Sequence, residues 1–211
     1  MKKQPRFHAL LIASTLFAGI ASFSTGCGRS ASDSSQEPVL ECIATRTSIR
    51  SFTDQPVEES HIEKILRAGM AAPTAVNKQP WAFVVVKDKV LLQTLADSLP
   101  NAKMTAQAAF AIVACGDMSK ALEGQAREFW VQDVSAATEN MLLAAHSLGL
   151  GAVWTGAYPD MQRAATIRKI LQIPSHIIPL NVIPMGYPAD SPTPKDKWKP
   201  ENVHYNTWGG K

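Results

Sequence analysis

The stretch TRTSIRSF, residues 45–52, holds residue types that bind anions. If this segment is extended, Ser48 and Arg50 share one face while Ile49 anchors the other, because alternate side chains point the same way. Arg46 would join them from the end of a preceding helix. A hydroxyl beside two guanidinium groups suits a phosphate or a carboxylate, since arginine offers paired planar donors that stay charged. Taken alone, the octapeptide is better explained as a solvated surface turn.

A second stretch, AAPTAVNKQPWAF at residues 71–83, predicts a loop that leads directly into a buried strand. Two prolines stiffen it, and between them Thr74, Asn77 and Gln79 can donate and accept hydrogen bonds toward the edge of a flat heteroaromatic ring. Loops at strand ends are common ligand sites in layered folds. A turn-rich connector is the alternative for this stretch taken singly.

A third stretch, GLGAVWTGAYP at residues 149–159, is dense in small residues. Its glycines and Ala157 would let the backbone lie against a planar ring, with main-chain N–H groups available as donors. Close packing of a helix on a strand demands small residues too, so this stretch is ambiguous by itself.

The C-terminal tail carries a fourth feature. Lys195 and Lys197 stand two residues apart after two prolines, in a weakly patterned segment rich in Pro, Lys and aromatic residues. The two ammonium groups would add charge to a phosphate site, or they belong to a solvated run. Such a tail is expected to pack on something other than its own core.

Several catalytic motifs are absent from the sequence. It has no GxSxG nucleophile elbow, no HExxH zinc motif and no GxxxxGK[ST] phosphate loop, and its five histidines lack metal-ligand spacing. A GxGxxG dinucleotide fingerprint also fails, because Trp154 stands where the third glycine belongs. We therefore predict no metal site and no Rossmann nicotinamide site.

The elements that must position these stretches follow from hydrophobic periodicity. Five helices are predicted, at Pro38–Arg46, Val57–Met70, Val90–Ser98, Val131–Leu148 and Met161–Leu171, and Gly149 is placed to cap the end of the fourth. Four strands are predicted, at Trp81–Val86, Phe110–Cys115, Ala152–Tyr158 and Ile177–Tyr187. Helices alternating with a few buried strands indicate an α/β or α+β layered domain.

In combination and in this order, the four stretches resemble the nitroreductase family of FMN-dependent oxidoreductases. The resemblance covers roughly Val39 to Trp208, and its most specific parts are RxSxR at Arg46–Arg50 and PTAVNKQPW at Pro73–Trp81. It implies an α+β fold with a central, mostly antiparallel sheet flanked by helices. It also implies an intertwined homodimer with two FMN sites at the subunit interface, over which the aromatic tail VHYNTW would lie as an arm; a tail packed within its own domain is the alternative.

The resemblance also implies residue roles. Arg46 and Ser48 would meet the FMN phosphate, joined by a tail lysine, and Arg50 would lie by the N1/O2 edge of the flavin. The proline-bounded loop would line the isoalloxazine, and the backbone of the third stretch would offer N–H groups near N5. The full predicted cofactor set is Arg46, Thr47, Ser48, Arg50, Pro73, Thr74, Ala75, Asn77, Gln79, Asn101, Lys103, Trp154, Thr155, Gly156, Ala157, Lys195 and Lys197.

The implied reaction carries hydride from NAD(P)H through flavin N5 to an electron-poor acceptor such as a nitroaromatic or a quinone, in ping-pong order, with no catalytic side chain.

Phe129 and Trp130 are predicted to contact the substrate, with core packing as the alternative for one of them. Trp154 either contacts the flavin or fills the core, and Glu139 is predicted to be structural or solvated. Runner-up functions are reductive dehalogenation, flavin cleavage, or non-enzymatic flavin binding by a lipoprotein.

The first 27 residues are typical of an export signal. Three basic residues precede an apolar run that ends in Ser-Thr-Gly-Cys27, which resembles a lipoprotein cleavage box. Cleavage to a soluble secreted protein is the alternative, and the Ser-rich residues 28–37 would form a tether before a domain at 38–211. Removing the leader lowers the basic count from 21 to 18, equal to the 18 acidic residues, so the domain has no general nucleic-acid footprint.

Export raises two further questions. NAD(P)H is scarce outside the cytoplasm, so either the leader is misread or the reductant is another donor, such as a quinol or a partner protein. Cys42 and Cys115 would either pair in an oxidising compartment or remain thiols, with Cys115 buried in the apolar run FAIVAC.

Overall fold

The computed structural model describes residues 37–210. The predicted signal, residues 1–27, and the predicted tether, residues 28–37, lie outside the described residues except for Glu37. The described residues belong to one structural unit. Within the described range, no helix combines the length and the apolar character needed to span a membrane.

The centre of this unit is an antiparallel sheet. The long strand β5 (Ile177–Gly186) pairs with β2 (Phe110–Asp117), which pairs in turn with β1 (Trp81–Val86). On its other side β5 pairs with two short segments, β3 (Gly151–Ala152) and β4 (Thr155–Gly156). These pairings confirm the predicted α+β class and the mostly antiparallel sheet.

Side chains of β2 alternate between two apolar layers. Ile112 and Ala114 belong to one core cluster, whereas Val113 and Cys115 belong to the other. Every residue of β2 is buried, because helices cover both faces of the sheet. The run FAIVAC is therefore continuously apolar, although half-solvated antiparallel strands usually alternate.

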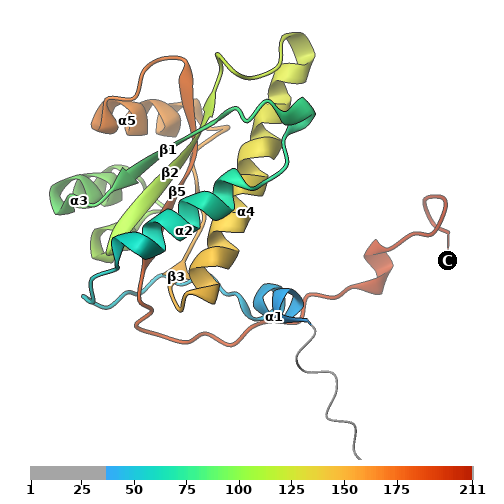
Figure 1. Ribbon diagram of the computed structural model, residues 1–211, viewed down its shortest axis with the longest axis horizontal. Coiled ribbons are helices and arrows are strands. Elements are labelled where there is room, and N and C mark those ends of the chain that lie inside the picture. Colours follow the sequence, from blue (N-terminus) through green and yellow to red (C-terminus); the bar gives the residue numbers. More distant parts are fainter. Residues whose placement is uncertain (1–36, 211) are drawn as a thin grey trace, which may run out of the picture. The chain divides into compact units, whose positions relative to one another are not determined.

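Two pairs of helices form the outer layers (Figure 1). On one face α2 (Glu59–Met70) packs against α4 (Phe129–Ser147), and Asn140 Nδ2 donates to the Ala68 carbonyl at 3.0 Å. On the other face lie α3 (Lys89–Ser98) and α5 (Met161–Leu171). Amphipathic stripes thus explain the four helices, each of which the sequence predicts within two residues at either end.

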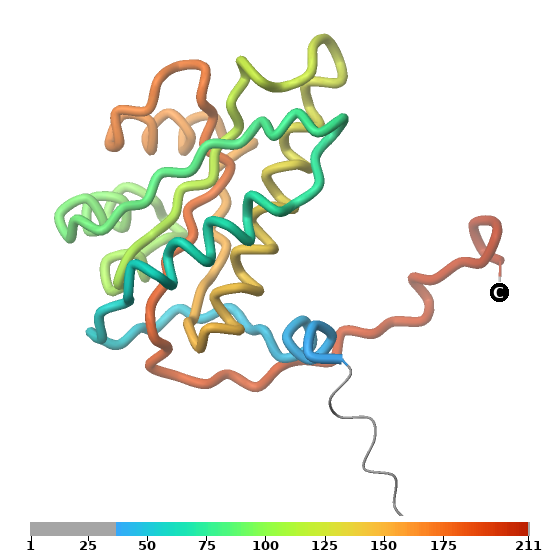
Figure 2. The backbone as a smooth tube through the Cα atoms, in the orientation of Figure 1, coloured from blue at the N-terminus to red at the C-terminus, as the bar shows by residue number. Residues whose placement is uncertain are grey.

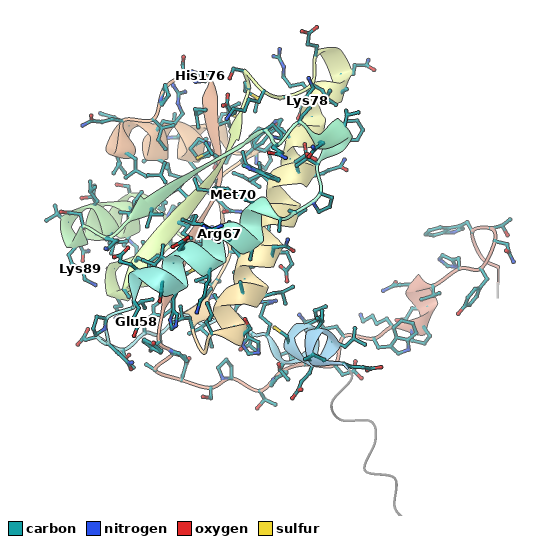
Figure 3. The ribbon with its side chains drawn as sticks, viewed as in Figure 1. Glu58, Arg67, Met70, Lys78, Lys89 and His176 are labelled. Carbon is teal, nitrogen blue, oxygen red and sulfur yellow. The ribbon has the colours of Figure 1, made fainter. Side chains whose placement is uncertain are left out.

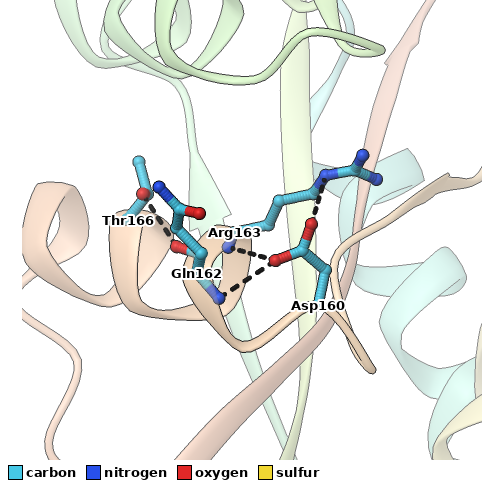
Figure 4. A network of polar contacts seen from close by, with 4 residues as sticks. All are labelled: Asp160, Gln162, Arg163 and Thr166. Carbon is cyan, nitrogen blue, oxygen red and sulfur yellow. Dashed lines mark hydrogen bonds and ion pairs between the residues drawn. The ribbon is translucent and has the colours of Figure 1, made fainter.

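Helix ends follow local capping chemistry. Asp160 begins α5 by accepting the backbone N–H groups of Gln162 and Arg163 at 3.0 and 3.1 Å, and it also pairs with the Arg163 side chain (Figure 4). Gly149, which follows the C-terminal end of α4, has a φ of +75°, a left-handed conformation that glycine adopts without strain. The predicted cap at this position is confirmed.

One predicted strand is wrong in extent. Ala152–Tyr158 is not continuous, because β3 and β4 are separated by Val153 and Trp154. The register on either side of the gap places Val153 opposite Pro184 of β5. Proline has no N–H to donate, so the ladder is interrupted at this pair.

The first helix and the tail present apolar residues to solvent. In α1 (Pro38–Thr45), Val39, Leu40 and Ile43 are all more than half exposed. Figure 2 shows the tail, residues 188–210, running beside α1 before its end projects away from the helices and the sheet. In this tail Trp198 is 70% and Trp208 is 91% exposed.

Candidate functional site

A groove of about 900 Å³ joins the start of the fold to its tail. Its walls are the end of α1, the extended segment after it, one residue of α4 and part of the tail. The lining residues are Ile43, Ala44, Arg46, Thr47, Ser48, Arg50, Glu139, Pro192, Thr193, Pro194, Lys195, Asp196 and Lys197. The first and fourth stretches singled out in the sequence therefore meet in space.

The segment after α1 is held by the edge of the sheet. Ser48 forms a parallel bridge with Ala152, and the Ile49 N–H donates to the Ala152 carbonyl at 3.0 Å. Ile49 is buried against Gly151, where an added Cβ would come within 2.6 Å of Ile49 Cγ2. Anchoring Ile49 inward leaves Ser48 and Arg50 on the opposite side, as predicted for an extended segment.

The groove carries an excess of positive charge. Arg46, Arg50, Lys195 and Lys197 contribute four cations, and Glu139 and Asp196 contribute two carboxylates, which leaves a formal charge of +2. Asp196 accepts the Trp198 N–H at 2.9 Å. A cationic groove with three hydroxyl side chains, those of Thr47, Ser48 and Thr193, fits the phosphate end of a ligand.

Arg46 is the most firmly placed of these cations. Its side chain is 19% exposed, and its Nε lies 3.4 Å from Glu139 Oε1. It follows α1 directly, and α1 is fastened to α4 by Cys42 and Thr45. Cys42 Sγ lies 3.5 Å from the Leu143 carbonyl, and Thr45 Oγ1 lies 2.9 Å from His146 Nε2. One wall of the groove is therefore formed by the short helix α1, which is hydrogen-bonded to the side of the long helix α4.

The second stretch forms a tightly specified loop. Val76, Asn77 and Gln79 all have positive φ values, between 46° and 56°, which are uncommon for residues other than glycine. The Gln79 N–H donates to Thr74 Oγ1 at 3.0 Å, and Gln79 Nε2 donates to Asn77 Oδ1 at 2.9 Å. Backbone strain that persists on an exposed loop is typical of a binding surface.

A buried carboxylate holds this loop. Asp133, only 6% exposed in α4, accepts the Ala75 N–H at 2.8 Å. The bond fixes the start of the short turn Ala75–Asn77 across 58 positions of sequence. Pro73, Asn77 and the other residues of the loop tip are exposed, so their polar groups face outward.

The loop and the groove do not meet within this chain. The loop contacts the first turns of α4 through Asp133, whereas the groove contacts that helix farther along, at Glu139. Figure 3 shows Lys78 of the loop beside the beginning of α4, and Figure 1 shows α1 at its other end. None of the residues 73–79 lines the groove. One chain therefore presents the two halves of the predicted site separately.

The third stretch offers one open backbone position. Gly156 lies opposite Asn181 in a pair next to the bonded pair of Ala157 and Leu180, so alternation turns the Gly156 N–H away from β5. A Cβ built on Gly156 would meet no atom within 4 Å. A flat ring can therefore approach the backbone here.

Two neighbours of Gly156 require correction. The Ala157 N–H donates to the Leu180 carbonyl at 2.9 Å, so the ladder consumes the donor that was predicted to face a ligand. Thr155 is buried, and its hydroxyl donates to the Val182 carbonyl at 2.7 Å. Trp154 is half-buried and packs against the core cluster under α4, in agreement with the core-filling alternative.

Asn101 and Lys103 lie outside the groove. Both are exposed, and Lys103 begins the turn Lys103–Gln107. This turn packs through Met104 against the Ile49–Phe52 cluster. Lys103 is therefore carried by an element that borders the Arg50 segment, but the side chain does not line the groove.

Of the two aromatic residues predicted to contact substrate, one is misplaced. Phe129 is 45% exposed, whereas Trp130 is 2% exposed and packs edge-on to Tyr158 with ring centroids 4.8 Å apart. A Cβ on Gly116 would come within 2.2 Å of the Trp130 ring. We therefore withdraw Trp130 as a substrate contact and assign it to the core.

This assignment predicts the effect of shrinking the ring. Trp130→Phe should lower the free energy of unfolding by about 1–2 kcal/mol, because it leaves a cavity in a filled interior. The exposed neighbour serves as the control: Phe129→Leu should change stability by no more than about 0.5 kcal/mol. Urea unfolding measures both. Unchanged stability of Trp130→Phe, together with an altered KM for the acceptor, would return Trp130 to the substrate pocket.

Cys42 and Cys115, the two cysteines among residues 37–210, are separate thiols. Burial raises the pKa of the Cys115 thiol to about 12, so this group is a neutral part of the core. Cys42 also has a raised pKa, because partial burial outweighs the opposing effect of nearby Arg46. Among residues 37–210 no group of three or more His, Cys, Asp or Glu side chains is placed to bind a metal.

Two residues that contribute to these surfaces were not predicted from the sequence to do so. Glu139 was expected to be structural or solvated, yet it lines the groove, and Asp133 was not singled out although it holds the loop. Glu139, Leu143 and His146 follow helical spacing and form the face of α4 that receives α1. The helical spacing of these three residues was visible in the sequence, but it shows that they contact α1 only once the packing of α1 on α4 is known.

The chain is similar in sequence to known proteins. Residues 43–100 and 92–187 match the model of the family described as the nitroreductase family. A Methanothermobacter thermautotrophicus protein with the provisional name NADH dehydrogenase/NAD(P)H nitroreductase is 47% identical over 175 residues, covering 82% of this chain and 90% of that protein. The oxygen-insensitive NADPH nitroreductase of Salmonella typhimurium is 32% identical over 181 residues, covering 81% of this chain and 75% of that protein.

A solved structure extends the similarity to three dimensions. A provisionally named nitroreductase from Desulfovibrio desulfuricans, determined in complex with FMN, superposes with a TM-score of 0.70 at 33% identity. The superposition covers 79% of this chain and 95% of that one.

Proposed function

Because the chain belongs to the nitroreductase family and is an FMN-dependent oxidoreductase, we propose that it reduces an electron-poor small molecule such as a nitroaromatic or a quinone at the expense of NAD(P)H. When bound, FMN would accept hydride at N5 from the nicotinamide and deliver it to the acceptor in ping-pong order. The chain's own residues bind the cofactor, orient it and set the charge around it.

The observation that carries this proposal is the cationic groove. It draws together Arg46 and Ser48 from the start of the fold and Lys195 and Lys197 from its tail, which are the residues proposed for the phosphate. Arginine donates paired bonds to phosphate oxygens, and the hydroxyl of Ser48 adds a third donor. Thr47 lines the same groove and would complete the cradle.

We propose that the ring end lies toward the edge strand. Arg50 leads out of the groove on the same segment and would place positive charge at the N1/O2 edge. The open Gly156 N–H would donate to N5, whereas Ala157 would contribute only a small surface. Orientation of this kind is what a flavin site must supply, since the cofactor itself carries the reactive atom.

We further propose that the working enzyme is a homodimer with two sites at its interface. The loop Pro73–Gln79, with the amides of Asn77 and Gln79, cannot reach its own chain's groove, so a second copy would bring it to the ring. The exposed apolar residues of α1 and of the tail would be covered by the same association. A two-fold dimer supplies such a shared site twice.

An absorbance spectrum of the purified domain, reconstituted with FMN and followed during anaerobic NAD(P)H addition, tests the proposed reaction. We expect a flavin spectrum that bleaches with NADPH or NADH and returns on addition of a nitroaromatic or a quinone. If neither NADH nor NADPH bleaches the bound flavin but a quinol does, the reductant is a quinol and not NAD(P)H. Bleaching that no acceptor of either class reverses would contradict the proposed acceptor class.

A further inference from the structure

The ion pair between Arg46 and Glu139 lies inside the groove proposed for the phosphate. The Arg46 Nε is 3.4 Å from Glu139 Oε1, and the Glu139 side chain is 50% exposed. The other carboxylate of the groove, Asp196, is instead occupied by the Trp198 N–H. Glu139 therefore forms an ion pair with the Arg46 guanidinium, whereas Asp196 does not.

This pair is set by the packing of two helices. Three successive positions on one face of α4 meet α1 and the residue after it: Glu139 meets Arg46, the Leu143 carbonyl meets Cys42, and His146 meets Thr45. Because Cys42 and Thr45 bond α1 to α4, the backbone of Arg46, which directly follows α1, is held beside Glu139. Lys195 and Lys197, by contrast, stand on a fully exposed segment.

Resting on the proposed function, we propose that Glu139 is an internal competitor for the phosphate end of FMN. Its carboxylate takes the place of a phosphate oxygen at Arg46 and keeps the guanidinium in the groove when the phosphate is away. When the phosphate arrives, two groups of like charge must share one arginine, and their repulsion weakens binding. Glu139 thereby makes the cofactor exchangeable rather than permanently held.

Glu139→Gln tests this role, with Asp196→Asn as the matched control. Both variants remove one negative charge from the same groove, but only the first removes the partner of Arg46. FMN dissociation constants are measured by fluorescence with the flavin-free full-length domain at low and high salt. We expect Glu139→Gln to bind FMN about five- to tenfold more tightly at low salt, with a smaller gain at high salt. Asp196→Asn should change the constant by about twofold or less.

Riboflavin, which has the same ring without the phosphate, separates the possible causes. Glu139→Gln should leave riboflavin affinity unchanged, because the competition concerns the phosphate alone. Unchanged or weaker FMN binding by Glu139→Gln would overturn the proposal and make Glu139 a positioning residue. Equal tightening by both variants, or equal tightening for riboflavin, would overturn it as well. Failure of the unaltered domain to bind FMN at all would instead sink the proposed function.

Discussion

Replacing Arg46 with alanine is expected to weaken FMN binding by about ten- to a hundredfold, because a charged hydrogen bond contributes about 1.5–3 kcal/mol and 1.4 kcal/mol corresponds to a factor of ten. The expected loss is large for a structural reason. Arg46 is the cation that the α1–α4 packing fixes in the groove, so the tail lysines cannot take its place. Its removal also leaves Glu139 facing the phosphate without a counter-ion.

The measurement is equilibrium binding of FMN, combined with the flavin content of the purified protein. Arg67→Ala is the control, since Arg67 lies on the exposed face of α2 in an ion pair with Glu63 and is remote from the groove. This variant should keep both the cofactor and the fold. Ser48→Ala should weaken FMN by a smaller factor, because it removes one hydroxyl. If Arg46→Ala keeps all of its FMN, the proposal that this groove binds the phosphate is wrong.

Mixing two defective chains should restore activity, because each site is proposed to take its groove from one subunit and its loop from the other. The first chain carries Arg46→Ala. The second carries Asn77→Gly and Gln79→Gly, which delete both amides, while glycine tolerates the positive φ values of these positions. Each variant alone should have little activity. Their mixed dimer should recover about half of the wild-type rate, since one of its two symmetry-related sites contains no altered residue.

Differently tagged chains, produced together and purified through both tags, supply the mixed dimer. Light scattering gives its mass, and turnover per dimer gives its activity. A site built within one chain would leave every site of the mixed dimer with one defect, and no activity would return. A monomer by light scattering at the assay concentration would also contradict the shared site.

Local pattern alone was sufficient for most of the architecture. The apolar periodicities of α2 and α4, the continuous runs of β1 and β2, and the Gly149 cap were all read from residues close together in sequence. The residue types at Arg46, Ser48 and Arg50 indicated a possible anion site, because a guanidinium stays charged wherever it lies. Only their combination with the other three stretches favoured that site over a surface turn. The nitroreductase resemblance depended on such short stretches, and family and fold comparisons confirm it.

Contacts between distant segments could be decided only by the folded chain. Residue patterns alone did not show that the tail lysines line one groove with Arg46, that the loop stays away from this groove, or that Glu139 pairs with the guanidinium. Nor did they show that Pro184 interrupts the edge strand, or that Trp130 turns inward beside Gly116. The physical reason is the same in each case: burial and hydrogen-bond partners depend on which surfaces the chain packs together, whereas propensity and charge belong to the residue itself.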